Sequence, residues 1–92
     1  MELSIEQKIK YLSRRIDEIG ILYESLKLND KEYISHIAHK LKGNGATFGF
    51  PEISQLAIDL ESAIAISDFK LIESLVNRFE RIVHEELNKL RP

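Results

Sequence analysis

Apolar residues recur at steps of three and four along almost the whole of this 92-residue chain. Such spacing places them on one side of an α-helix, and no stretch shows the strict alternation typical of a half-buried strand. Turn-forming residues interrupt the pattern at 29–30, 49–51 and 67–68. The sequence therefore predicts four amphipathic helices joined by short connections.

Local signals support the helix starts, and the periodicity predicts the buried side of each helix. Ser4 and Gln7 match a capping box at the start of the first helix. Asn29 or Asp30 is the expected cap of the second helix, which is predicted to continue to 49–51, and Pro51 suits the first turn of the third. The predicted core residues are Ile5, Ile9, Leu12, Ile16, Ile19, Tyr23 and Leu26, then Tyr33, Ile34, Ile37, Leu41 and Phe48, then Ile53, Leu56, Ala57, Leu60 and Ile64, and finally Phe69, Ile72, Val76, Phe79, Val83 and Leu87.

Four apolar stripes joined by connections of a few residues can be hidden from water only by antiparallel packing. We therefore predict an all-α fold, an antiparallel up-down-up-down four-helix bundle that forms a single domain over residues 1–92. A chain of this length buries only about 60–65% of the surface of its unfolded form, which leaves no room for a deep active-site cavity. Because four stripes suffice for one core, we expect a monomer.

Composition excludes several classes of function. With 43% hydrophobic and 30% charged residues, the chain has the composition of an ordinary globular protein. A net charge of -2 argues against nucleic acid as the main partner, and the absence of cysteine excludes thiol chemistry and thiolate metal sites. Residues 1–10 lack the apolar core of a signal peptide, and no segment approaches the roughly 20 apolar residues of a membrane span. We therefore expect a cytoplasmic protein without membrane insertion.

The predicted second helix places a histidine next to a lysine and a glycine on its outer side. His39 lies two positions from both Ile37 and Leu41, so the helix turns it roughly 200° away from each of these core residues. Lys42 and Gly43 follow three and four positions later and share its outward side. The helix is thus expected to present an exposed imidazole beside a cation.

Glycine in a helix interior costs roughly 1 kcal/mol relative to alanine, so Gly43 needs an explanation. A bulky side chain at this position would crowd the ring of His39 one turn earlier, and glycine keeps the approach open. Lys42 adds a mobile positive charge that suits an anion, above all phosphate. Neutral imidazole is a nitrogen nucleophile that can carry a phosphoryl group.

The segment HKLKGNGATFGF at 39–50 resembles the signature of histidine-containing phosphotransfer (HPt) domains. The matching positions, in order, are His39, Leu41, Lys42, Gly43, Ala46 and Gly49. The resemblance covers essentially the whole chain, because the family also has four helices with the motif in the second. Asn44 and Gly45 depart from the serine or alanine that is frequent there, and this flexible pair is expected to loosen the end of the helix.

The resemblance implies a multistep two-component phosphorelay. HPt domains accept a phosphoryl group on histidine from the aspartyl phosphate of one receiver domain and pass it to the aspartate of another. On this basis His39 is the phosphoacceptor, Lys42 compensates the charge of the phosphoryl oxygens, and Gly43 gives the receiver access. The implied partners are response-regulator receiver domains or a hybrid sensor histidine kinase. The receiver would bring Mg²⁺, so this chain is expected to be a phosphoryl carrier that needs no cofactor and has no kinase activity of its own.

Other interpretations remain beside this one. His36 lies near His39 but lacks a following Lys-Gly pair, and His84 is expected to be a flanking residue of the fourth helix. Glu32, His36 and His39 have the spacing of metal ligands, yet they point outward without matching carboxylates, so no metal site is expected. Ile58 lies off the stripe of the third helix, where it could dock a receiver or widen the core face. The alternative function is a helical adaptor that docks a kinase or receiver domain without being phosphorylated.

Overall fold

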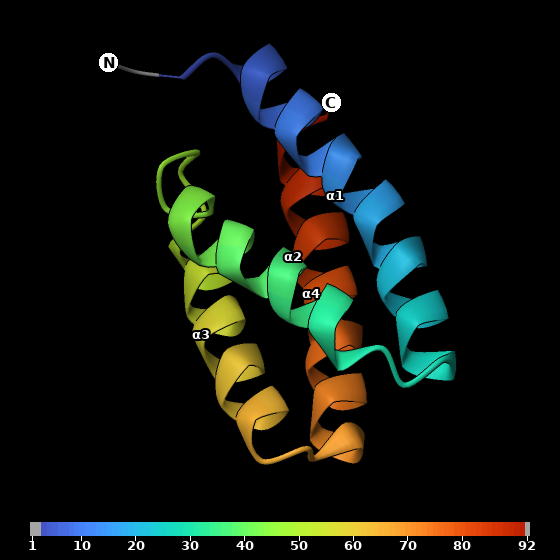
Figure 1. The fold of residues 1–92 in the computed structure, drawn as a ribbon. Helices are drawn as coiled ribbons and strands as arrows, with labels where there is room; N and C mark the ends of the chain where they lie inside the picture. Colours follow the sequence, from blue (N-terminus) through green and yellow to red (C-terminus); the bar gives the residue numbers. More distant parts are fainter. Residues whose placement is uncertain (1–2, 92) are drawn as a thin grey trace.

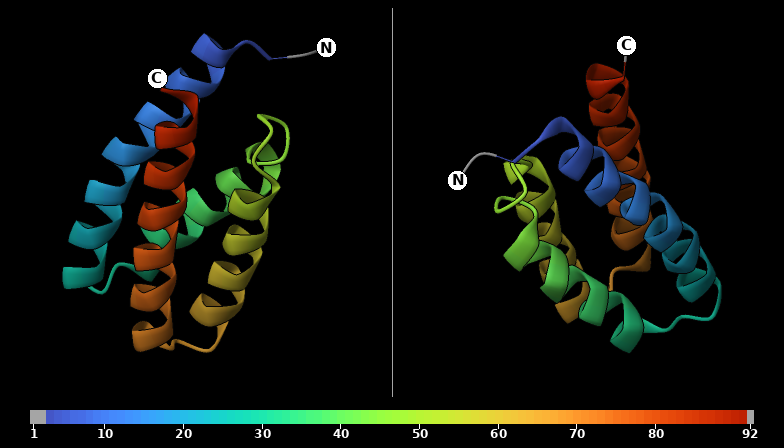
Figure 2. Two further views of the ribbon diagram at one scale, coloured as in Figure 1. Left: turned by 180° about the vertical axis from the view of Figure 1, so that it is seen from behind. Right: turned by 90° about the horizontal axis from the view of Figure 1, so that it is seen from above.

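The computed structural model describes residues 3–91, which form four α-helices and no strand (Figure 1). The helices are α1 (Ile5–Lys27), α2 (Lys31–Asn44), α3 (Pro51–Ala65) and α4 (Phe69–Leu90). Each helix runs opposite to the one before it, and α4 lies between α1 and α3 when the molecule is viewed from behind (Figure 2). The predicted all-α, up-down-up-down bundle is therefore confirmed.

The starts of the helices follow the local signals in the sequence. The Ser4 hydroxyl accepts a hydrogen bond from the Gln7 amide at 3.1 Å, and Gln7 Oε1 accepts one from the Ser4 amide at 2.8 Å. This is the predicted capping box. Asp30 caps α2, whereas Asn29 takes a left-handed turn conformation with φ of 53° just before it. Pro51 is the first residue of α3, where its missing N–H removes no helical hydrogen bond.

The buried face of α1 differs from the predicted stripe. Ile5 and Ile16 are 59% and 36% exposed, whereas Tyr11 and Leu22 are buried. Relative to the fully buried Leu12, Leu22 lies about 80° to one side of the helix and Ile16 about 40° to the other. Because α1 packs mainly on α4, this contact turns its buried side toward Leu22. The periodicity found the helix but not this rotation.

The predicted course of α2 also needs correction. Tyr33 is 39% exposed at the edge of the helix, whereas the small Ala38 is fully buried. The helix ends at Asn44, before the predicted 49–51, and a turn follows in which Gly49 has φ of 91°. The positive φ favours glycine at that position.

The end of α2 is tightly packed, which contradicts the looseness expected at Asn44 and Gly45. Asn44 Oδ1 accepts a hydrogen bond of 2.5 Å from the Tyr11 hydroxyl on α1. Gly45 is buried against the start of α3, where a Cβ atom would lie only 2.7 Å from the Ser54 nitrogen. Ser54 Oγ in turn accepts a hydrogen bond from the Ala46 amide at 2.8 Å. Gly45 therefore permits a close approach of α3 to α2.

The remaining core follows the prediction more closely. In α3 and α4 most predicted positions are buried, with Ile64 and Phe69 partly buried at the margin. Buried residues that the prediction omitted are Ala63, Leu75 and Ile82 in these two helices and Phe50 just before α3. None of the helices in the described part of the chain is long and apolar enough to cross a membrane.

Candidate functional site

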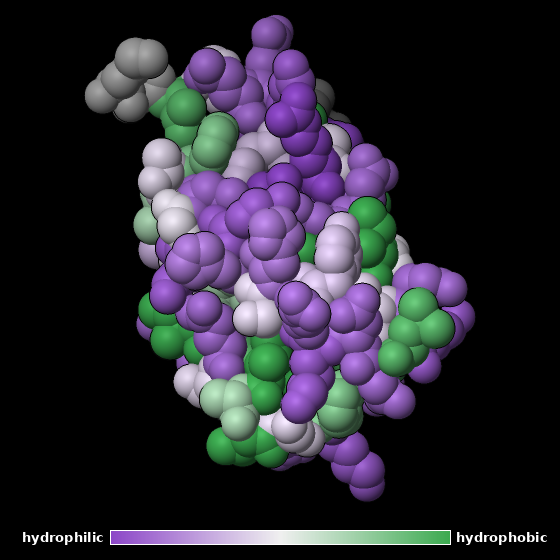
Figure 3. Space-filling model, viewed as in Figure 1, coloured by the Kyte–Doolittle hydropathy of each residue, from purple (hydrophilic) through white to green (hydrophobic). Residues whose placement is uncertain are grey.

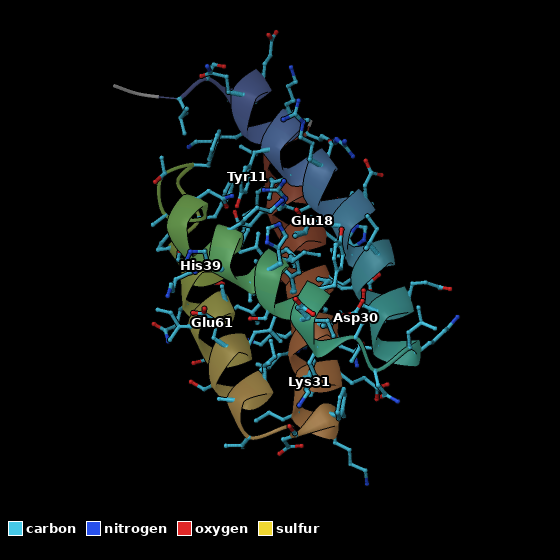
Figure 4. All side chains as sticks on the ribbon, in the orientation of Figure 1. Tyr11, Glu18, Asp30, Lys31, His39 and Glu61 are labelled. Carbon is cyan, nitrogen blue, oxygen red and sulfur yellow. The ribbon has the colours of Figure 1, made fainter. Side chains whose placement is uncertain are left out.

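His39 stands on the outer side of α2, as its position in the helix predicts. Its side chain is 75% exposed, whereas Ile37 and Leu41 on either side in the sequence are buried in the core. Figure 4 shows His39 on α2 and Glu61 just below it, on the neighbouring helix α3. The imidazole is therefore open to a partner that approaches α2 from solvent.

A carboxylate on α3 lies between His39 and Lys42. Glu61 Oε1 is 3.0 Å from Lys42 Nζ, and Glu61 Oε2 is 3.8 Å from His39 Nδ1. The first distance is an ion pair, whereas the second is too long for a hydrogen bond. The Lys42 side chain is 42% exposed and that of Glu61 is 30% exposed, so water reaches the pair. Glu61 thus holds the lysine ammonium on the α3 side of the imidazole.

Gly43 contributes open space to this surface. A Cβ atom built at this position would meet nothing within 4 Å, the imidazole of His39 included. The fold therefore does not require glycine here, in contrast to the closely packed Gly45. A single methyl group would also leave the ring free, so the crowding predicted from the sequence applies only to longer side chains.

Other residues singled out in the sequence lie in different surroundings. His36 is exposed, and its ring is tilted against that of Tyr33 with centroids 6.4 Å apart. Asp30 and Glu32 line a shallow depression with these two residues, so the neighbourhood of His36 is acidic. His84 is exposed on α4.

Two further features from the sequence analysis are the possible metal ligands and Ile58. Within residues 3–91, no group of three or more His, Cys, Asp or Glu side chains is arranged to hold a metal ion. Ile58 is 43% exposed, so it does not widen the core face of α3. It lies three residues before Glu61 on the same helix, which places an apolar side chain next to the carboxylate.

Comparison with known proteins adds evidence beyond this geometry. The model of the Hpt domain family matches residues 10–91, which include His39 and its surroundings. No match was found among curated proteins or among solved structures. Hpt domains interact with receiver domains and kinases in two-component phosphorelays. Because the family match spans nearly the whole sequence, the chain belongs to the Hpt domain family and has the fold of a phosphotransfer domain of such relays.

Proposed function

We propose that His39 carries the phosphoryl group in a multistep phosphorelay. An imidazole nitrogen of His39 attacks the phosphorus of an aspartyl phosphate on one receiver domain, and the aspartate carboxylate leaves. In the second transfer an aspartate of another receiver attacks the phosphohistidine, and the imidazole leaves. The observation that carries this proposal is the 75% exposed His39 side chain next to a lysine within a chain of the Hpt family.

Phosphoryl transfer mainly requires a positioned nucleophile and compensation of charge. The buried residues on either side of His39 anchor α2, so the rigid helix presents the ring in a defined direction. Before transfer, Lys42 is paired with Glu61. After transfer, its ammonium group is expected to exchange the carboxylate for the phosphoryl oxygens, which carry more negative charge. In this proposal the receiver supplies Mg²⁺, and this chain supplies the imidazole and the lysine.

Incubation with a phosphorylated receiver domain tests the proposal. We expect phosphate to appear on this chain in an acid-labile, base-stable form, as is characteristic of phosphohistidine, while the receiver loses its phosphate. Transfer should reverse when a second, unphosphorylated receiver with Mg²⁺ is added. Stable binding to the receiver without any transfer would instead support the adaptor function and contradict the proposal.

Lys42→Gln is expected to slow transfer from a phosphorylated receiver about tenfold. A charge-assisted hydrogen bond contributes about 1.5–3 kcal/mol, and partial exposure to water reduces this to roughly the 1.4 kcal/mol of a tenfold effect. Lys40→Gln is the matched control, since Lys40 is also exposed on α2 but its charge acts on Glu18 of α1. The initial rate of transfer is measured for both variants. Equal reductions in the two rates would disprove the role of Lys42.

Gly43→Ala and Gly43→Gln are expected to separate helix stability from access to the imidazole. Both variants should unfold at the same or a higher temperature, because glycine is up to about 1 kcal/mol less favourable in a helix. Gly43→Ala should transfer phosphate at nearly the normal rate, since its methyl group meets nothing within 4 Å. Gly43→Gln should transfer more slowly, because its longer side chain can cover the ring. Equal transfer rates for the two variants would show that Gly43 is not needed for access.

A further inference from the structure

A second concave surface lies on the opposite flank of α2 from Glu61. This groove of about 390 Å³ is formed by α1, the last residue of α2 and the following turn. Figure 4 shows Tyr11 at this position, above and apart from His39 and Glu61. Figure 3 shows a strongly hydrophilic surface over the same part of α1. None of the residues proposed to act in phosphoryl transfer lines the groove.

The polar groups left free in the groove are hydrogen-bond donors. Lys10 and Arg14 contribute an ammonium and a guanidinium group. Gln7 uses its oxygen to accept from Ser4, which leaves its side-chain NH₂ available. Asn44 uses its oxygen to accept from Tyr11, which likewise leaves its NH₂ available. Among the described residues, no carboxylate lines the groove, so its lining favours an anion.

The two exposed cations have no partner within residues 3–91. Arg15 is paired with Glu18 at 3.0 Å and lies over the Tyr11 ring at 4.4 Å from its centroid. By contrast, neither Lys10 nor Arg14 forms an ion pair with any residue in this range. They stand four positions apart on one helix, where like charges repel each other. An anion bound between them would remove this repulsion.

Aromatic rings form the remaining wall of the groove. Phe48 stacks on Tyr11 with ring centroids 4.5 Å apart and an interplanar angle of 14°. Tyr11 is buried, and its hydroxyl is fixed by the bond to Asn44, so the wall is rigid. Phe48 is only half-buried and lines the groove. A flat apolar group can therefore pack against the wall while its charges reach the cations.

We propose that this groove binds a small organic dianion with a flat apolar part, of the class of aromatic dicarboxylates and aryl phosphates. Two cations one helical turn apart match two negative groups, and the Phe48 wall matches an aromatic ring. The volume lies at the lower end of the range of about 300–1,000 Å³ that is typical of small-molecule sites. This binding does not depend on His39 or on the phosphorelay function.

Titration of the full chain with phthalate, followed by ¹H–¹⁵N NMR, tests the proposal. Signals of residues 7–15 and 44–48 are expected to shift and to saturate. Inorganic phosphate, which lacks a ring, should bind more weakly at the same residues. Benzamide, which has the ring but no charge, should cause no saturable shift. Shifts that do not saturate, or that centre on His39 and Lys42, would overturn the proposal.

A pair of charge-matched double variants provides the control. Lys10→Gln with Arg14→Gln is expected to weaken phthalate binding at least about tenfold, because both charge-assisted contacts are lost. Lys70→Gln with Arg78→Gln removes the same charge from exposed positions of α4 and should leave the affinity unchanged. Equal weakening in both variants would mean non-specific attraction. Absence of phthalate binding together with loss of receiver binding in the first variant would assign the groove to a protein partner and contradict our proposal.

Discussion

His39→Gln is expected to abolish phosphoryl transfer from a phosphorylated receiver, whereas His36→Gln is expected to retain it. The amide of glutamine has a similar reach but no nucleophilic nitrogen, so the phosphoryl group has no acceptor. Both histidines are exposed on α2, and neither substitution removes a core contact. The two variants thus differ in whether they keep the nucleophile beside Lys42, which makes each a control for the other.

Transfer is measured by the phosphate retained on each variant after incubation with the same phosphorylated receiver. Thermal unfolding and binding to the receiver should be alike for the two, since the substitutions are on the surface. If His39→Gln retained transfer and His36→Gln lost it, His36 would be the acceptor and the assignment to His39 would be wrong. Equal transfer in both would place the acceptor elsewhere.

Gly45→Ala is expected to lower the free energy of unfolding by about 1–3 kcal/mol, which is typical of overpacking. The added Cβ atom would lie 2.7 Å from the Ser54 backbone nitrogen and 2.8 Å from its hydroxyl. Since these atoms belong to the first turns of α3, the start of that helix must shift. The hydrogen bond from the Ala46 amide to Ser54 Oγ would be strained as well. For a domain of this size, each kcal/mol corresponds to roughly 4–8 °C in Tm.

Gly43→Ala is the matched control for Gly45→Ala, because it makes the same substitution two positions earlier on the outside of α2. It should unfold at the same or a higher temperature, since the new methyl group meets nothing within 4 Å. Denaturant unfolding of both variants measures the difference. If Gly45→Ala were as stable as Gly43→Ala, that result would contradict the close approach of α3 to Gly45.

Much of the fold could be predicted from the sequence, because helical periodicity and capping depend on residues that are close together in the chain. The capping box at Ser4, the cap at Asp30 and Pro51 at the start of α3 all depend on residues within one turn. The rotation of α1 could not be predicted, because it depends on how α1 packs against α4. The end of α2 at Asn44 was missed for a similar reason. The turn from Gly45 onward is set by contacts with α3, which lies further along the chain.

The residues of the candidate site also differ in whether their positions could be predicted from the sequence. The outward direction of His39 and Lys42 follows from counting along one helix, and the structure agrees. Glu61 was missed because its position beside them depends on the register between α2 and α3. The contact of Gly45 with Ser54 sets this register. His39 lies six residues before Gly45, and Glu61 lies seven residues after Ser54. Because α2 and α3 are antiparallel, this register places His39 and Glu61 side by side.

We propose that the phosphoryl group resides on the imidazole of His39, and mapping the phosphate on the chain shows whether it does. The chain is phosphorylated by a receiver, kept at neutral to alkaline pH, and mapped by tandem mass spectrometry of its peptides. We expect the phosphate on His39 alone. Phosphate on His36, on His84 or on a side chain other than histidine would contradict a role of His39 as the acceptor. An unmodified chain after the receiver has lost its phosphate would contradict it as well.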